Sequence, residues 1–167
     1  MEGATPFQTA GPYLRIGLRA GLRPMRLAGG RSGTPIAVRG RLLDGAGEGI
    51  ADGALEFWHP AFVEVGRVLT ERDGGFRLQT VKPPPGSSAD EAPHFAVRVL
   101  GRGILTEYLT RMYFDDEPAT PGDQVLARVP SARRRTLIAT SVGEGEYHLD
   151  IVVQGERETV FFDPMSL

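Results

Sequence analysis

Three histidines are the residues in this sequence best suited to acid–base or metal chemistry, and they are dispersed along the chain. His59 follows a predicted strand, His94 begins another directly after Pro93, and His148 falls on the polar face of a third. Their spacings are not those of a metal site, so hydrogen-bonded or solvent-facing roles are the simpler interpretation. The carboxylates cluster only at 115–117, where a solvated turn explains them.

Other kinds of catalytic site find little support in the residues. The chain contains no cysteine, which excludes thiolate nucleophiles, zinc–thiolate sites and disulfides. No serine stands in a nucleophile elbow, and the GEGEY run around Gly145 is typical of a hairpin turn rather than a phosphate-binding loop. Taken alone, these residues describe a fold without a self-contained active site.

The elements that would position these residues are short strands separated by turns. Twenty-two glycines and 13 prolines punctuate the 167 residues, and apolar side chains alternate with polar ones between them. The Asp73–Gly74 turn indicates a hairpin. The run 106–114 fits a helix or a strand, and its β-branched and aromatic content favours the strand. Strands are predicted at 35–43, 54–58, 67–70, 76–80, 94–100, 106–114, 136–142, 147–154 and 158–162. This pattern predicts an all-β sandwich.

Two segments do not follow the strand pattern. Residues 1–34 hold many glycines and arginines with only scattered apolar residues, which predicts an extended N-terminal arm that is either disordered or laid against its own domain or a partner. The proline-rich run 82–93 cannot pair as a strand and is predicted to be a loop. We therefore expect an arm over 1–34 and one β-sandwich domain over 35–167.

Composition narrows the possible partners and location. Lysine and arginine number 19 against 21 aspartates and glutamates, and this net charge of −2 does not support binding to nucleic acid or anionic membranes. No apolar run approaches the ~20 residues of a membrane span, and no basic segment followed by an apolar stretch marks a secretion signal. We expect a cytoplasmic protein.

Several segments, in order along the chain, resemble the intradiol ring-cleaving dioxygenases, and specifically the alpha subunits of the protocatechuate-cleaving enzymes. TPFQTAGPY at Thr5–Tyr13 is similar to the TPSQTAGPY arm of those subunits, and ETVFFD at Glu158–Asp163 is similar to their closing segment. GRLLDGAGEGIADGALEFW at Gly40–Trp58 resembles their strand–turn–strand. The resemblance implies a prealbumin-like β-sandwich of the intradiol dioxygenase type.

The resemblance also implies a cofactor, and a reason why this chain would not hold it. In the family a non-haem ferric ion, Fe(III), is held by two tyrosinates and two histidines. Here the H-x-H segment reads PHFAV, so His94 matches the first histidine and Ala96 replaces the second. The loops matching the tyrosine ligands, KPPPGSSAD and HPAFVEVG, contain no tyrosine. We expect no metal ligands and no catalytic residue in this chain, with His94 the relic of a ligand position.

The implied role is therefore that of the subunit without iron. Its partner would be the iron-bearing beta subunit in a large hetero-oligomer that opens protocatechuate with O₂ to 3-carboxy-cis,cis-muconate. The family resemblance assigns part of the substrate pocket to Arg102 and to the arm residues Thr9, Ala10, Gly11, Pro12 and Tyr13. A glycine–proline turn allows close approach to an aromatic substrate, and a guanidinium suits its carboxylate. A turn that only docks the arm, and a solvated arginine, are the simpler alternatives.

Two other functions remain open from the sequence. A non-enzymatic prealbumin-like binding module would fit the central strands equally well, but it would have no use for the TPFQTAGPY arm. A self-sufficient enzyme with a different metal site would need more ligands than three dispersed histidines offer.

Overall fold

The computed structural model describes residues 9–11, 13–18, 33–62, 65–86, 88 and 90–163. Their nine strands are β1 (Pro35–Leu43), β2 (Ala54–Trp58), β3 (Gly66–Leu69), β4 (Gly75–Val81), β5 (Phe95–Leu100), β6 (Tyr108–Phe114), β7 (Ile138–Gly143), β8 (Glu146–His148) and β9 (Ile151–Val152). Their helices are short: α1 (Tyr13–Leu18), η3 (Thr120–Gly122), α2 (Gln124–Arg128), α3 (Ser131–Arg134) and η4 (Arg135–Leu137). In this part of the chain, none of the helices has the length and apolar character needed to cross a membrane.

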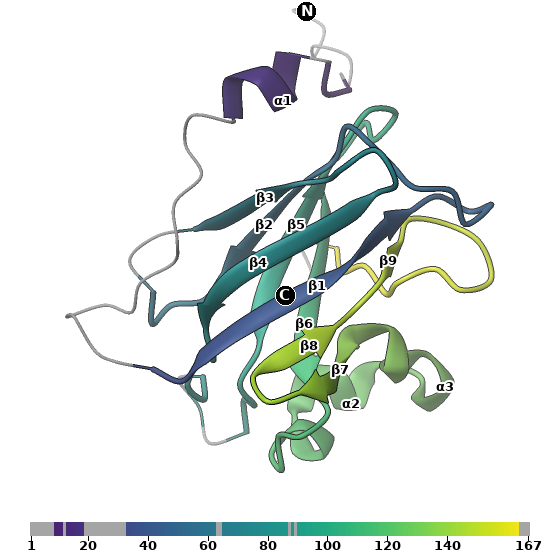
Figure 1. Cartoon of the computed structure of the whole chain (residues 1–167). Helices are drawn as coiled ribbons and strands as arrows, with labels where there is room; N and C mark the ends of the chain where they lie inside the picture. The colour runs from purple at the N-terminus through teal and green to yellow at the C-terminus, as the bar shows by residue number, and fades with distance from the viewer. Residues whose placement is uncertain are drawn as a thin grey trace, which may run out of the picture.

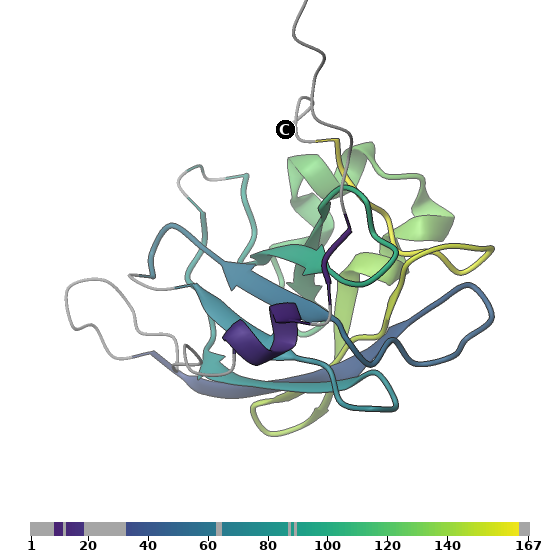
Figure 2. The ribbon, with the colours of Figure 1, turned by 90° about the horizontal axis from the view of Figure 1, so that it is seen from above.

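The strands form one continuous sheet that bends back on itself until it is nearly closed (Figures 1 and 2). Its order is β3-β2-β5-β6-β7-β8-β1-β4, with β9 beside β1, so the first and last strands along this path are β3 and β4. These two strands also contact each other. The β1–β8, β1–β9 and β6–β7 pairs are parallel, and the others are antiparallel.

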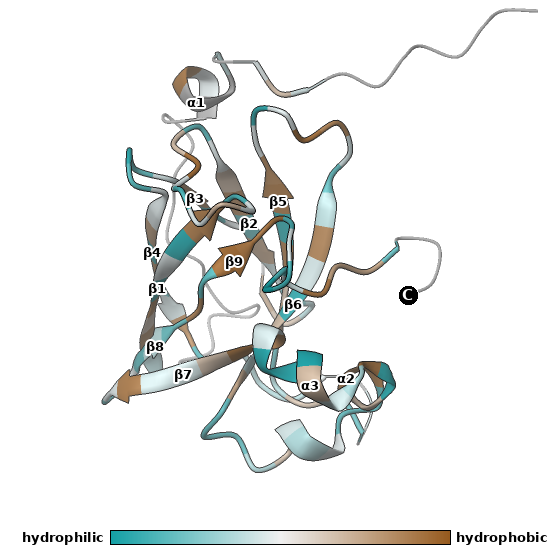
Figure 3. Ribbon diagram, turned by 90° about the vertical axis from the view of Figure 1, so that its right-hand side faces the viewer, coloured by the Kyte–Doolittle hydropathy of each residue, from teal (hydrophilic) through white to brown (hydrophobic). Residues whose placement is uncertain are grey.

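Side chains that alternate along the strands fill the space enclosed by the sheet. Every second residue of β4 is buried, namely Phe76, Leu78 and Thr80, while Arg77 and Gln79 face water. The same period-2 burial in β5 places Phe95, Val97 and Val99 in the main core. Brown, hydrophobic positions alternate with teal ones along several strands in Figure 3. Burial of these apolar side chains is the main stabilising term of the fold.

The end of β6 is buried on both faces. Met112 and Phe114 belong to the main core, whereas Tyr113 points to the opposite face, and all three are fully buried. Tyr113 is covered by a second apolar cluster from α2, η4 and neighbouring loops, which comprises Ala92, Leu126, Val129 and Leu137. Figure 3 shows α2 and α3 gathered at this end of β6. These helices therefore cap the sheet at the end where β5 begins.

Most of the predicted strands are confirmed, including the strand interpretation of 106–114, and four details are corrected. No hairpin forms at Asp73–Gly74, because β3 pairs with β2 whereas β4 pairs with β1. The turn instead connects strands that lie far apart along the sheet order. Residues 158–162 form only an isolated bridge, between Leu109 and Phe162. The predicted strand 147–154 is divided into β8 and β9, and 136–142 begins with η4 before β7.

Gly40 marks the closest approach between β1 and the segment that joins β8 to β9. The Leu149 amide donates a hydrogen bond to the Arg39 carbonyl at 3.0 Å, which brings this backbone directly over Gly40. A β-carbon added at Gly40 would lie 1.8 Å from the Leu149 carbonyl oxygen. The Leu149 carbonyl group is part of the backbone and cannot rotate away, so only a shift of β1 or of the β8–β9 segment would relieve this clash.

Gly40→Ala is therefore expected to destabilise the fold by about 3 kcal/mol or more, above the usual cost of overpacking. Thermal unfolding should shift down by roughly 6 °C or more for a domain of this size. Gly143→Ala is the matched control, since its added β-carbon would only touch the Glu146 side chain at 3.9 Å. Equal melting temperatures for both variants would contradict the close approach at Gly40.

Candidate functional site

The arm residue Thr9 contacts the turn that carries Arg102. The Gly103 amide donates a hydrogen bond to the Thr9 hydroxyl oxygen at 2.7 Å, and this hydroxyl lies 3.4 Å from the Gly101 carbonyl oxygen. Two predicted pocket elements that are more than 90 positions apart in the sequence are thus brought together in space. The sequence resemblance predicted each element separately, but it did not predict their contact.

The register of β2 against β5 explains the partner of Arg102. Ala54 pairs with Leu100 in this antiparallel ladder, so continuing the register by two residues sets Asp52 opposite Arg102. The Arg102 Nη2 donates to the Asp52 Oδ2 at 2.6 Å. The arginine side chain is 61% exposed, and it is paired rather than free to swing as a solvated side chain. Asp52 was not among the predicted site residues, although the strand register identifies it.

The other predicted pocket residues of the arm are half-buried, exposed or outside the described part of the chain. Ala10 is half-buried and Gly11 is exposed, and a β-carbon at Gly11 would meet no atom within 4 Å. Tyr13, the first residue of α1, is 79% exposed. Pro12 lies outside the described residues. Among residues 9–11 and 13–18, the part of the arm that the structure describes, Thr9 is the residue that bonds to the Arg102 turn.

His94 lies at the opposite end of β5 from Arg102, in a buried aromatic cluster. Its Nδ1 is 2.8 Å from the Ala92 carbonyl oxygen, and this acceptor requires the proton to be on Nδ1. Its ring centre lies 5.9 Å from that of His59 and 5.4 Å from that of Tyr113. The interpretation of His94 as a hydrogen-bonded histidine at a strand end is confirmed, but its edge-to-face contact with His59 was not predicted.

Asp123 holds this cluster together, and it was missed in the sequence. Its carboxylate, 1% exposed, accepts hydrogen bonds from the amides of Ala92, Val125 and Leu126 and from the Tyr113 hydroxyl, all within 3.0 Å. Two of these amides form the first turn of α2, so Asp123 is an N-cap. The Asp-Gln-Val-Leu run is the signal that indicates such a cap.

Burial sets the protonation of the cluster. Loss of water lowers the pKa of His94 below its ordinary value, and burial together with the nearby His94 lowers that of His59. Burial raises the pKa of the Tyr113 hydroxyl far above its ordinary value, although Arg111 opposes this shift. All three groups are therefore neutral at pH 7. The His59 Nδ1 accepts from the Ala61 amide, which places the proton on a buried Nε2 without a partner in the described structure.

This cluster does not fit a ferric ion. Fe(III) favours anionic oxygen ligands, but burial keeps the Tyr113 hydroxyl protonated and its hydrogen bond goes to Asp123. The His94 Nδ1 is occupied by the Ala92 carbonyl, and its Nε2 lies 3.8 Å from Glu91. Among the residues that the structure describes, no three histidine or carboxylate side chains are placed to hold a metal ion together.

The other candidate residues have structural roles. His148 is exposed, as predicted, with its Nε2 3.2 Å from Asp150. The 115–117 cluster does form a turn, but its carboxylates are partnered. Asp116 accepts hydrogen bonds from Lys82, at 3.0 Å, and from the Tyr147 hydroxyl, at 2.8 Å. These contacts link the residue after β4 to β8 through the turn that follows β6.

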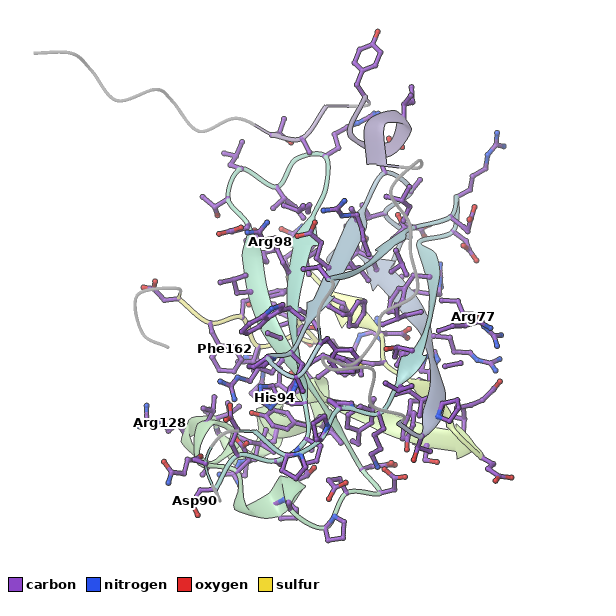
Figure 4. All side chains as sticks on the ribbon, turned by 90° about the vertical axis from the view of Figure 1, so that its left-hand side faces the viewer. Arg77, Asp90, His94, Arg98, Arg128 and Phe162 are labelled. Atoms are coloured by element: carbon purple, nitrogen blue, oxygen red, sulfur yellow. The ribbon has the colours of Figure 1, made fainter. Side chains whose placement is uncertain are left out.

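The two ends of β5 therefore differ in character. Figure 4 shows His94 beside the α2 and α3 end and Arg98 nearer to the end that carries α1. The six residues of β5 separate the buried histidine cluster from the exposed Arg102 turn by roughly 20 Å. A ligand that meets Arg102 and the arm cannot at the same time meet His94 of the same chain.

Comparison with known proteins places the chain in a family. No protein-family model matches it. It is 38% identical over 191 residues to the protocatechuate 3,4-dioxygenase alpha chain of Burkholderia cepacia, an alignment that covers 95% of this chain and 96% of that relative. The alpha chain of Pseudomonas putida matches equally well, with 38% identity over 192 residues and the same coverage of both chains. The chain belongs to the protocatechuate 3,4-dioxygenase alpha-chain family.

More distant relatives agree with this assignment. The beta chain of the Burkholderia cepacia enzyme is 28% identical over 158 residues, with 76% of this chain and 67% of the beta chain covered. The 3-chlorocatechol 1,2-dioxygenase of Rhodococcus opacus superposes with a TM-score of 0.61 over 91% of this chain and 68% of its own, at 19% identity. The structural likeness establishes an intradiol dioxygenase fold.

The buried histidines predict how stability changes with pH. A histidine whose pKa is lowered by folding contributes stability above its unfolded pKa, about 6.5, and that contribution is lost as the pH falls below this value. The melting temperature of the full chain should therefore drop between pH 7.5 and 5.5. His59→Asn, which keeps an acceptor for the Ala61 amide, should reduce the drop. His148→Gln, at an exposed site, should not alter it. A drop of the same size in His59→Asn would exclude His59 as a source.

Proposed function

We propose that this chain is the alpha subunit of a protocatechuate 3,4-dioxygenase. Together with an iron-bearing beta subunit, it would open protocatechuate between its two hydroxylated carbons with O₂, giving 3-carboxy-cis,cis-muconate. The observation that carries the proposal is the 38% identity to an alpha chain along nearly the whole of both sequences. The match to a beta chain supports a partner of related fold.

In this proposal the ferric ion is bound by the beta subunit and not by this chain. The support is chemical: the position matching the second histidine ligand is Ala96, and the tyrosine beside His94 is buried, neutral and bonded to Asp123. The end of β5 that would correspond to a metal site is filled by the chain's own side chains. The subunit then contributes assembly and pocket wall rather than catalytic groups.

The N-terminal residues supply the assembly role. We assign residues 1–34 to an arm that packs on the partner and residues 35–167 to a prealbumin-like β-sandwich domain. Two large apolar side chains of α1 support this, since Tyr13 is 79% and Ile16 67% exposed. Leu105, in the loop that follows the Arg102 turn, is 57% exposed. Covering these side chains with a second subunit would remove apolar surface from water.

The Arg102 turn and the arm residues Thr9, Ala10, Gly11, Pro12 and Tyr13 would contribute the pocket wall. Only Nη2 of the Arg102 guanidinium bonds to Asp52, so its other N–H groups have no hydrogen-bond acceptor in the described structure. A guanidinium held in this way can donate to the carboxylate of protocatechuate. The exposed Gly11 presents no side chain to obstruct a ring.

Co-expression tests the assignment of the iron. The chain purified alone should be colourless, free of bound iron and inactive on catechols. Co-purified with its beta subunit, it should give a complex with the visible absorption of a ferric–tyrosinate centre and with protocatechuate-cleaving activity. One equivalent of tightly bound iron in the chain alone would refute the proposal. A chain that never associates with a beta subunit would favour the alternative of a non-enzymatic binding module.

Arg102→Ala in the assembled enzyme tests the pocket. The KM for protocatechuate should rise several-fold, because a charge-assisted hydrogen bond to a desolvated carboxylate contributes roughly 1.5–3 kcal/mol. The KM for catechol, which lacks the carboxylate, should change much less, and the iron content should not change.

Arg77→Ala is the matched control. This arginine lies on the outer face of β4, 52% exposed and 3.7 Å from Glu146, and well away from Arg98 of β5, the strand that leads into the Arg102 turn (Figure 4). Both KM values should stay unchanged. Equal losses for the two substrates in Arg102→Ala would indicate a structural arginine instead.

A further inference from the structure

Arg102 stands at the corner of an ordered turn. The Ile104 amide donates to the Gly101 carbonyl at 3.3 Å, which closes a four-residue turn with Arg102 and Gly103 at its centre. Gly103 has a φ of +83°, a conformation that glycine adopts without the cost that other residues incur. Positive φ at the third position is typical of a type II turn. The backbone at Arg102 is therefore set by the glycine that follows it.

Thr9 bonds to this turn from the arm side. The Gly103 amide is not used by the turn's own hydrogen bond, and it donates instead to the Thr9 hydroxyl at 2.7 Å. The single hydroxyl proton of Thr9 can in return be donated to the Gly101 carbonyl, 3.4 Å away. The Ala10 carbonyl oxygen is a second acceptor for this proton, also 3.4 Å away, so the donor capacity of Thr9 is directed to backbone carbonyls.

Asp52 bonds to the turn from the sheet side. It lies in the turn before β2, two residues beyond the last β2–β5 pair, and its carboxylate is 32% exposed, half as much as the arginine side chain it meets. The contact uses one terminal nitrogen of the guanidinium, at 2.6 Å. It fixes the direction of Arg102 and leaves the remaining N–H groups free to donate outward.

We propose that Thr9 and Asp52 are positioning residues that hold the Arg102 turn from opposite sides, so that recognition of a substrate carboxylate depends on both. Thr9 holds the turn through the Gly103 amide, and Asp52 holds the side chain at its corner. This inference rests on the proposed function, since it takes Arg102 as the group that meets the carboxylate.

Thr9 is tested with two variants that separate its hydroxyl group from its shape. Thr9→Val removes the hydroxyl and keeps the shape, whereas Thr9→Ser keeps the hydroxyl. In the full chain, hydrogen exchange at the Gly103 amide should accelerate about tenfold or more in Thr9→Val and stay near wild type in Thr9→Ser. In the assembled enzyme, Thr9→Val should raise the KM for protocatechuate several-fold, with kcat and the KM for catechol nearly unchanged. Unchanged exchange in Thr9→Val, or no rescue by serine, would overturn the role of Thr9.

Asp52 is tested with a double-mutant cycle. Asp52→Asn should raise the KM for protocatechuate two- to fivefold in the wild-type background and have no further effect in Arg102→Ala, because residues that act through one contact are not additive. A lower KM in Asp52→Asn would mean that Asp52 competes with the substrate, and an additive effect would mean that it acts elsewhere. Either result overturns its positioning role.

The same variants separate this inference from the proposed function. If Arg102→Ala leaves both KM values unchanged, the pocket role of Arg102 is wrong, and the specificity claim for Thr9 and Asp52 is overturned with it. If Arg102→Ala acts as expected while Thr9→Val and Asp52→Asn do not, the proposed function stands and the positioning inference fails.

Discussion

The buried carboxylate of Asp123 is the interaction on which the architecture around His94 depends. It joins the start of α2 to the turn before β5 and to the end of β6, two segments that the β5–β6 pairing already sets side by side. A buried charge is costly unless hydrogen bonds satisfy it, and here four donors do so. In meeting this requirement, the chain draws Ala92 and α2 over Tyr113 and seals the end of the sheet where β5 begins.

Because this end of the sheet is covered, the histidines beneath it are not exposed to a ligand. Behind Ala92 lie His94 and His59, both buried and neutral, so the groups most capable of acid–base or metal chemistry are used to pack the interior. At the far end of β5 the arrangement is reversed. Asp52 and Arg102 are brought together by strand register, and they stay accessible to anything that approaches the turn.

Sequence could predict the parts of the fold that depend on local pattern. Strands with one buried face, such as β4 and β5, show the period-2 alternation that identifies them, and residues 35–43 and 54–58 are predicted to the residue. The pattern was ambiguous in 106–114 because the end of β6 is buried on both faces. The prediction of a hairpin at Asp73–Gly74 was wrong because a turn sequence does not determine which strands the two flanking strands will pair with. The contacts of Thr9 with Gly103, and of Asp52 with Arg102, depend on tertiary register, which no local pattern contains.

In the proposed function, the contrast between the two ends of β5 also gives the N-terminal arm a role. A subunit that has filled one end of its sheet with its own side chains can influence a ligand only through surfaces it presents outward. A single exposed arginine would be a weak determinant, because solvent screens it and its side chain loses entropy on binding. Here the turn is closed by its own hydrogen bond, its free amide is taken by Thr9 of the arm, and its guanidinium is held by Asp52. Ordering these groups before a ligand arrives reduces the entropy lost on binding, which is how preorganisation raises affinity and selectivity.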